Sequence, residues 1–156
     1  MLRNVVTLLC ARLDGVTWAL TGSLGMALQG VPLTPHDVDV QTDAAGAYEI
    51  QQRLAEFATR PVAFSAAERV RSHFGVFLVH GVPMEVMGDI EKRRADGTWE
   101  PPPDLPRIIR YATLDRLRVP VLDLAYEIEA YTTLGRLERA AFLRAWLTQQ
   151  GKNSNL

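Results

Sequence analysis

The sequence predicts a single α/β or α+β domain in which a mixed β-sheet is flanked by helices. Its 156 residues are enough for one domain with a hydrophobic core of its own. Hydrophobic residues make up 47% of the chain and charged residues 22%, as in ordinary globular proteins. The predicted elements run helix, strand, helix, strand, helix, then several strands and again helices, an order typical of a mixed sheet.

The first half of the chain alternates between helices and strands. Apolar residues recur at helical spacing over residues 2–13, and the short apolar run at 17–21 predicts a buried strand. A short helix over 24–28 and a strand over 38–41 follow. Residues 44–58 carry the clearest amphipathic pattern, which predicts a helix with one face on the core.

The second half predicts a group of strands, a surface loop and a helical end. Short apolar runs bounded by glycine or proline indicate strands, and two of them are close enough to form a hairpin across Gly81-Val82. In order, the predicted elements are a strand that begins at Pro61, strands over 74–80 and 83–87, a polar Pro-rich loop over 91–106, strands over 108–113 and 117–121, and helices over 123–134 and 136–147.

The pattern indicates one domain without an internal repeat. We expect a single domain over residues 1–150, with its core over about 15–90 and a C-terminal helical part over about 122–150. A flexible tail is expected over 151–156, where polar residues follow a glycine.

The overall charge limits the classes of partner. Seventeen Lys and Arg against eighteen Asp and Glu give a formal charge of −1, so a strongly basic nucleic-acid-binding surface is not favoured. The single Cys10 excludes an internal disulfide, and no apolar run reaches the length of a membrane span. The sequence therefore predicts a reduced cytoplasmic protein with no membrane partner, and leaves a homodimer open.

A Gly22-Ser23 turn joins the strand over 17–21 to the following helix. Such a turn exposes backbone N–H groups at a helix start, where an anion can bind, and the Ser23 hydroxyl adds a donor. Glycine allows a phosphate to approach the backbone closely. Taken alone, the same two residues also suit an ordinary turn.

Asp37 and Asp39 form the most informative pair. Residues two apart on a strand point to the same face, so the two carboxylates lie side by side while Val38 and Val40 face the other way. This is unfavourable unless a cation lies between them, and Mg²⁺ prefers carboxylate oxygens. The alternative is an exposed edge strand with two solvated acids.

Glu85 supplies a third acid, within the apolar run over 82–87. Because burying an unpaired carboxylate is costly, this residue needs a partner. If its strand lies beside that of Asp37 and Asp39, the three carboxylates converge, and two magnesium ions could bind a nucleoside triphosphate there. Asp89 is an alternative third acid, but the strand phase favours Glu85. A surface-facing Glu85 is the simpler interpretation when it is considered alone.

Gly22-Ser23, Asp37-Val38-Asp39 and Glu85 on a later strand resemble the signature of the polymerase-beta-type nucleotidyltransferase superfamily. The resemblance covers residues 17–88. It is strongest to the small bacterial branches, namely antibiotic nucleotidyltransferases and stand-alone members related to toxin–antitoxin systems. His36, directly before the acid pair, fits the antibiotic-modifying branch.

The resemblance implies a role for each of these residues. Gly22 and Ser23 would contact the triphosphate, Asp37 and Asp39 would bind both metal ions, and Glu85 would be the third ligand or the general base. The sequence departs from the family in two ways. It is too short for the second domain of larger members, and it has Leu24-Gly25-Met26 where some members carry a basic residue.

Basic residues near the predicted sheet are candidates for phosphate binding. Arg71 leads into the strand over 74–80 and is assigned to the triphosphate. Lys92-Arg93-Arg94 follows the Glu85 strand and is better interpreted as a solvated charged turn.

The sequence thus predicts an enzyme: a magnesium-dependent nucleotidyltransferase that moves a nucleoside monophosphate from a triphosphate, with ATP as the expected donor, to an acceptor hydroxyl. The acceptor, a small molecule or a protein, is not identified. The alternative is a catalytically inactive member of the same fold that acts as an antitoxin-like or regulatory binding module.

Overall fold

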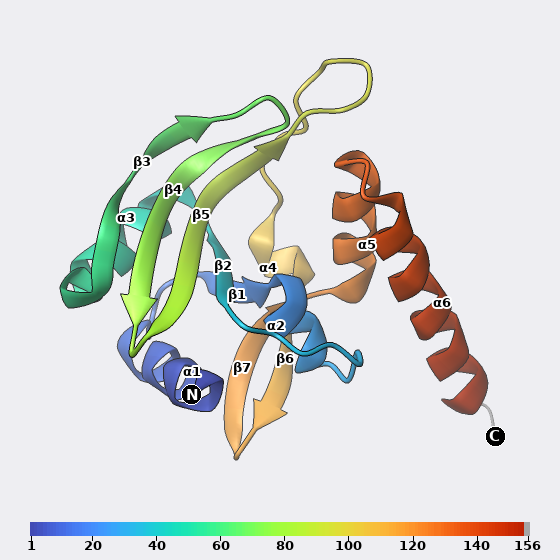
Figure 1. The fold of residues 1–156 in the computed structure, drawn as a ribbon, viewed down its shortest axis with the longest axis horizontal. Coiled ribbons are helices and arrows are strands. Elements are labelled where there is room, and N and C mark those ends of the chain that lie inside the picture. Colours follow the sequence, from blue (N-terminus) through green and yellow to red (C-terminus); the bar gives the residue numbers. More distant parts are fainter. Residues whose placement is uncertain (155–156) are drawn as a thin grey trace.

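A seven-stranded mixed sheet forms the centre of the protein (Figure 1). The computed structural model describes residues 1–154. Its elements are α1 (Leu2–Arg12), β1 (Trp18–Thr21), α2 (Gly22–Ala27), β2 (Val38–Thr42), α3 (Ala44–Arg53), a 3₁₀ turn η1 (Ala55–Phe57), β3 (Ala58–Ala66), β4 (Val70–Val79), β5 (Val82–Lys92), α4 (Leu105–Ile108), β6 (Ile109–Leu114), β7 (Leu117–Leu122), α5 (Leu124–Thr133) and α6 (Leu137–Ser154).

The strand order places the first two strands of the chain in the middle of the sheet. It runs β3-β4-β5-β2-β1-β7-β6. Strand β2 pairs in parallel with β5, and β1 in parallel with β7, whereas the other neighbours are antiparallel. The observed architecture confirms the predicted mixed sheet flanked by helices.

One face of the sheet carries the main hydrophobic core. Helices α1 and α3 pack there, because their apolar stripes meet the inward-facing residues of the strands. Leu9 and Ile50 from the helices, and Leu20, Val40 and Met84 from the strands, are all fully buried.

The opposite face is covered only in part. Leu105 of α4 and the partly buried Tyr126 of α5 pack near Ala19 and Leu122, over β1 and β7. Helices α5 and α6 form a pair with a small core of its own. In Figure 1 this pair stands to one side, α3 lies behind β3, β4 and β5, and no helix crosses in front of these three strands. The face of β3, β4 and β5 that is opposite to α3 is therefore not covered by a helix.

Two tight turns join neighbouring antiparallel strands of the sheet. His80 and Gly81 join β4 to β5 with φ values of 50° and 80°, and Asp115 and Arg116 join β6 to β7 in the same backbone region. Two consecutive positive φ values define the primed turns whose twist matches that of antiparallel strands. The first turn lies one residue earlier than the sequence predicts.

Several element boundaries differ from the prediction: β3 and β4 begin earlier, at Ala58 and Val70, and the short helix α4 is not among the predicted elements. Helix α3 ends at Arg53 and a 3₁₀ turn redirects the chain into β3. Strand β5 continues to Lys92, into the predicted loop over 91–106, because Val70 and Arg71 of β4 pair with Lys92 and Glu91. Helix α6 extends to Ser154, so most of the predicted tail over 151–156 is helical, and residues 155–156 lie outside the described part.

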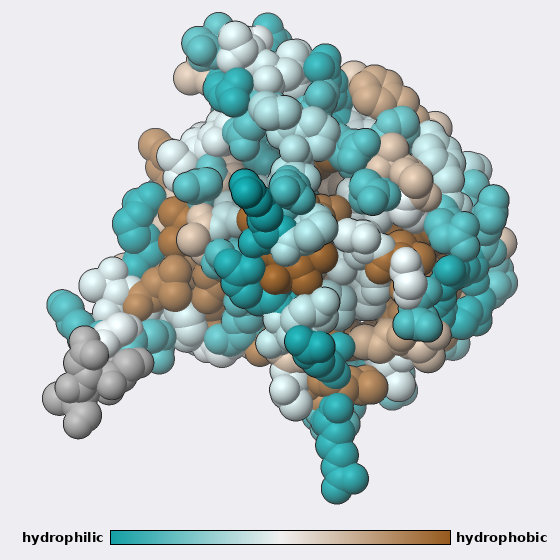
Figure 2. Space-filling view, turned by 180° about the vertical axis from the view of Figure 1, so that it is seen from behind, coloured by the Kyte–Doolittle hydropathy of each residue, from teal (hydrophilic) through white to brown (hydrophobic). Residues whose placement is uncertain are grey.

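The face seen from behind is mainly hydrophilic, with separate hydrophobic patches, one of them beside the C-terminal end of the described chain (Figure 2). Large exposed apolar side chains occur on several elements, namely Phe64, Leu78, Tyr111, Leu137 and Phe142. None of the helices within residues 1–154 combines the length and apolar character that crossing a membrane requires.

Candidate active site

The sheet register brings Asp39 and Glu85 side by side. Asp39 of β2 lies opposite Glu85 of β5 in the parallel pair, and Thr21 of β1 lies opposite Asp39 on the other side. Opposite residues on neighbouring strands share a face, with strands about 5 Å apart. The predicted convergence of these two acids from separate strands is therefore present in the fold.

Asp37 lies just before β2 and is exposed. Its charge nevertheless acts on Asp39, whose pKa is raised to about 7. Burial is the largest cause of this shift, and the negative charges of Asp37 and Glu85 add to it. Each effect disfavours the ionised form of Asp39. The three predicted acids thus form one electrostatic group in which negative charge is not balanced.

A divalent cation fits the chemistry of this group. Carboxylate oxygens are the ligands that Mg²⁺ prefers, and a cation would remove the repulsion that raises the pKa of Asp39. Within residues 1–154, no three His, Cys, Asp or Glu side chains are already gathered around one metal position. The fit consequently rests on donor type and charge.

Gly22 allows the turn to approach Asp39. Its φ of 68° lies in the left-handed region, and a Cβ atom at this position would lie 2.8 Å from Asp39 Oδ2. Ser23 follows at the start of α2, where Arg139 of α6 donates a hydrogen bond to its Oγ at 3.3 Å. The Gly22-Ser23 turn is therefore in contact both with an acid of the group and with a basic residue.

Replacing Gly22 with alanine tests this close approach. We expect Gly22→Ala to lower the free energy of unfolding by about 2–3 kcal/mol, since a left-handed alanine costs about 1 kcal/mol and the carboxylate must also move. Gly15→Ala is the matched control, because Gly15 has a φ of 80° but open space around it. Urea denaturation measures both, and equal losses would show that contact with Asp39 is unimportant.

Asp39 and Glu85 line a cleft of about 250 Å³ between the sheet and the helical pair, whereas Asp37 lies outside its lining. Its walls combine acidic, basic and apolar side chains from strands β1, β2, β4 and β5, from helices α2 and α5, and from the turn between α5 and α6. The lining residues are Thr21, Gly22, Asp39, Gln41, Val70, Glu85, Met87, Ile90, Lys92, Glu127, Ala130, Tyr131, Leu134 and Arg136.

Glu127 of α5 is the main functional candidate that sequence reasoning missed. It is 4% exposed, and it accepts hydrogen bonds from Thr21 Oγ1 at 2.5 Å and from the Gly22 N–H at 3.3 Å. Burial raises its pKa to about 7, although these two hydrogen bonds and the charge of Lys92 oppose the shift. Glu127 thus connects the C-terminal helices to the glycine turn.

Lys92 is buried, which corrects its interpretation as part of a solvated turn. It is 3% exposed, and its Nζ donates to the hydroxyl of Tyr126 at 2.8 Å. Tyr126 in turn donates to Gln41 Oε1 at 3.4 Å. Lys92 lines the same cleft as Asp39, Glu85 and Glu127, and its positive charge lowers the pKa of Glu127 against the effect of burial.

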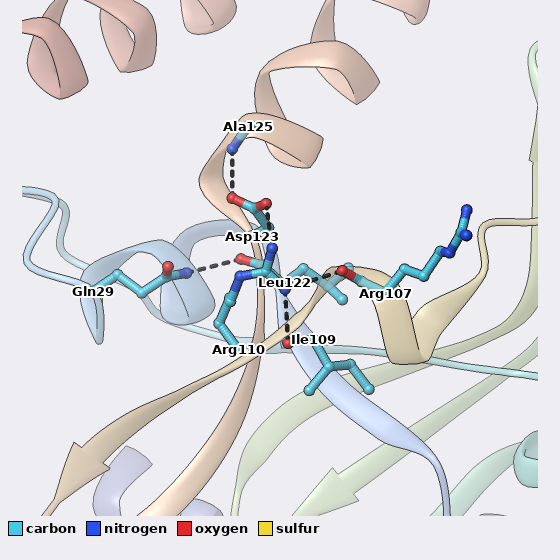
Figure 3. A network of polar contacts seen from close by, with 7 residues as sticks. All are labelled: Gln29, Arg107, Ile109, Arg110, Leu122, Asp123 and Ala125. Atoms are coloured by element: carbon cyan, nitrogen blue, oxygen red, sulfur yellow. Dashed lines mark hydrogen bonds and ion pairs between the residues drawn. The ribbon is translucent and has the colours of Figure 1, made fainter.

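A polar network fixes where α5 begins (Figure 3). Asp123 caps the helix by accepting from the Ala125 N–H at 3.0 Å, and Arg110 of β6 contacts the other carboxylate oxygen at 3.1 Å. Gln29, after α2, donates to the Leu122 carbonyl at 2.9 Å. These contacts tie α5 to the sheet and to the segment after α2, and so hold Glu127 in place.

Arg71 does not line the cleft, contrary to its assignment to the triphosphate. It pairs with Glu91 on the other face of the sheet, and its guanidinium lies 4.2 Å from the centre of the Trp99 ring. The reason is strand alternation: Val70 faces the cleft, so the next residue faces away. The basic residues that line the cleft are Lys92 and Arg136, and Arg139 of α6 contacts Ser23 of the glycine turn.

Asp89 also lies outside the cleft lining. Strand β5 has a β-bulge here: Asp89 and Ile90 together lie opposite the single residue Ser72 of β4. The φ of Asp89 is 49°. This bulge turns Ile90 and Lys92 onto the cleft side. Glu85, and not Asp89, is therefore the third acid of the group.

A Gly-Ser turn beside acids on adjacent strands of a mixed sheet is the arrangement of a nucleotidyltransferase. The comparisons with known proteins agree: the profile of the aminoglycoside-2''-adenylyltransferase family matches residues 1–142. The chain belongs to this family.

Solved structures show the same fold. A candidate nucleotidyltransferase from Thermotoga maritima is 47% identical, with 94% of this chain and 92% of that chain covered and a TM-score of 0.81. The lincosamide antibiotic adenylyltransferase LnuA, in its lincomycin-bound form, is 13% identical, with 90% and 94% covered and a TM-score of 0.56. No curated protein sequence matches the chain.

Proposed function

We propose that this protein transfers a nucleoside monophosphate, with ATP as the expected donor, to a hydroxyl group of an acceptor, and that Mg²⁺ assists. The observation that carries the proposal is the acidic group around Asp39, where Asp37 and Glu85 add to the effect of burial and raise its pKa to about 7. The names of the family and of LnuA support an adenylyl donor.

Asp37, Asp39 and Glu85 are proposed to hold the metal. When bound, a divalent cation would neutralise charge on the triphosphate and polarise the phosphorus–oxygen bond. Glu85 is exposed at the open side of the cleft, so it is the acid placed to take the proton of the acceptor hydroxyl. The acceptor oxygen forms a bond to the α-phosphorus as the bond to the β-phosphate oxygen breaks, and pyrophosphate leaves.

The triphosphate is proposed to lie toward the start of α6. Arg136 lines the cleft and Arg139 already contacts the Ser23 hydroxyl, so both can reach phosphate oxygens. The Gly22 N–H, expected on the triphosphate, donates to Glu127 in this structure. Glu127 is therefore proposed as a positioning residue, which sets the conformation of the turn without contacting the nucleotide.

Calorimetry with ATP and Mg²⁺ tests the proposal. We expect the wild-type protein to bind ATP in a metal-dependent manner and the Asp37→Ala, Asp39→Ala double variant to lose that dependence, because the carboxylates are the metal ligands. Arg139→Ala should weaken binding by about tenfold, the usual scale for a charged hydrogen bond, whereas Arg71→Ala should not.

Two outcomes would contradict the proposal. Identical metal-independent behaviour of the wild type and the double variant would exclude the acidic group as the metal site. The absence of nucleotide binding in the wild type would instead favour a non-catalytic binding module with this fold.

A further inference from the structure

The cleft continues into the open face of β3, β4 and β5. Successive cross-strand rows run outward from the acids across this face. Asp39 is followed by Glu85, Val76 and Arg60, whereas Gln41 is followed by Met87, Phe74 and Ala63. In Figure 1 no helix crosses in front of these strands, and the α5–α6 pair lies beside them. The rest of a molecule whose hydroxyl lies at Glu85 would therefore contact the open face of β3, β4 and β5.

The face is apolar where it adjoins Glu85. Val76 lies directly opposite Glu85, and Phe74 lies opposite Met87, which itself lines the cleft. Leu78 follows on the same side of β4 and is 49% exposed. An uncovered apolar surface that is continuous with a polar site is typical of a binding surface.

Beyond Glu85, the charge of this face is positive. In the two rows beyond Glu85, the charged side chain is Arg60, whose guanidinium lies 5.2 Å from the centre of the Phe74 ring. No carboxylate within residues 1–154 forms an ion pair with Arg60. Strand spacing of about 5 Å puts Arg60 about 10 Å from Glu85 along its row. Under the proposed function, the three acids nearby, Asp37, Asp39 and Glu85, hold the metal ion.

We infer that the acceptor is a hydroxyl compound with a flat apolar body and an acidic group, not a polycation. The hydroxyl would lie at Glu85, the apolar body over Val76 and Phe74, and the acidic group at Arg60. Beyond Glu85, a polyamine antibiotic would place protonated amines on an apolar surface beside an arginine, in two rows that carry no carboxylate. This inference rests on the proposed function for the reacting hydroxyl, but the surface preference can be measured separately.

Two probes of equal shape and opposite charge test the preference: 4-(hydroxymethyl)benzoate and 4-(hydroxymethyl)benzylamine. Methyl NMR of the four methionines reports where each binds. Met87 lines the cleft, while Met84 is fully buried on the other face and Met26 lies in the α5–α6 core. We expect the benzoate to shift the Met87 methyl signal, assigned with Met87→Leu, and to bind several-fold more tightly than the benzylamine.

Charge reversal at Arg60 gives the matched variant. Arg60→Glu should weaken benzoate binding by about fivefold, the upper end for an exposed ion pair, and should favour the benzylamine. Arg118→Glu is the control, because Arg118 is also exposed and lies over an aromatic ring, that of Tyr111, on another part of the sheet. It should leave both affinities unchanged.

The inference is overturned if the benzylamine binds the wild type as tightly as the benzoate, if Arg60→Glu leaves the preference unchanged, or if neither probe shifts Met87. A transfer assay with ATP, Mg²⁺ and kanamycin separates this from the proposed function. Efficient adenylylation of kanamycin would refute the acceptor class while supporting nucleotidyl transfer. Failure of nucleotide binding in calorimetry would refute the transfer chemistry. The relative affinities of the benzoate and the benzylamine, measured by NMR, would still show whether the open face prefers an acidic compound.

Discussion

Asp39→Asn is expected to reduce nucleotidyl transfer on the order of a thousandfold and, at the same time, to stabilise the metal-free protein at pH 8. Transfer is lost because an amide neither neutralises nor binds the divalent cation as a carboxylate does. Stability rises because the ionised Asp39 is partly buried beside two other acids. Activity and stability thus change in opposite directions.

The sign of the stability change follows from the pKa. An unfolded aspartate titrates near 3.8, whereas Asp39 in the folded protein titrates near 7. Between these values the folded state retains a proton that the unfolded state has released, so the free energy of unfolding falls as the pH rises. Above pH 7 the full penalty is present, and we expect about 2 kcal/mol, since part of the carboxylate remains solvated.

Thermal unfolding with EDTA at pH 4 and pH 8 measures this effect. The variant and the wild type should unfold at similar temperatures at pH 4, and the variant should unfold several degrees higher at pH 8. Addition of Mg²⁺ should stabilise the wild type and close most of the gap. Asp89→Asn is the control and should leave transfer unchanged, because Asp89 lies outside the cleft. A destabilised Asp39→Asn at pH 8 would show that the acids do not repel one another.

Lys92→Met is expected to destabilise the protein by about 3 kcal/mol at pH 8, the usual cost of leaving a buried charge without its compensating partner. Glu127 is the charge left behind: it is almost completely buried, and the charge of Lys92 holds its pKa down. The loss should be smaller at pH 6, where Glu127, with a pKa near 7, can bind a proton.

A double-mutant cycle with Glu127→Gln isolates the interaction. Glutamine keeps the size of the side chain and removes the charge, so Lys92→Met should cost much less in its presence. Urea denaturation of the four proteins at pH 8 gives the coupling energy. A coupling near zero would mean that the cost of Lys92→Met comes from its contact with Tyr126, at 2.8 Å, and not from Glu127.

Local patterns predicted the acidic half of the candidate site. Period-two spacing placed Asp37 and Asp39 together, and Glu85 stood out as an acid in an apolar strand. The pairing of Asp39 with Glu85 joins residues far apart in the sequence, which periodicity cannot show. The roles of these acids as metal ligands remain a proposal.

The basic and C-terminal half of the site depends on contacts that sequence spacing does not specify. Arg71 was assigned to the cleft because it leads into the correct strand, but the alternation of β4 turns it to the other face. The sequence does carry a signal for Glu127. It lies three residues after Leu124 and four before Tyr131, on the buried stripe of α5. A carboxylate on such a stripe needs a buried partner.

The strand order separates the parts of the proposed site along the chain. Strands β3 and β4 are consecutive in the chain and occupy one edge of the sheet, so one continuous segment, residues 58–79, forms the outer part of the open face. The glycine turn, β2 and the start of α6 lie outside that segment. Under the proposed function, substitutions in the β3–β4 hairpin would therefore change acceptor preference without changing the residues proposed to contact the triphosphate.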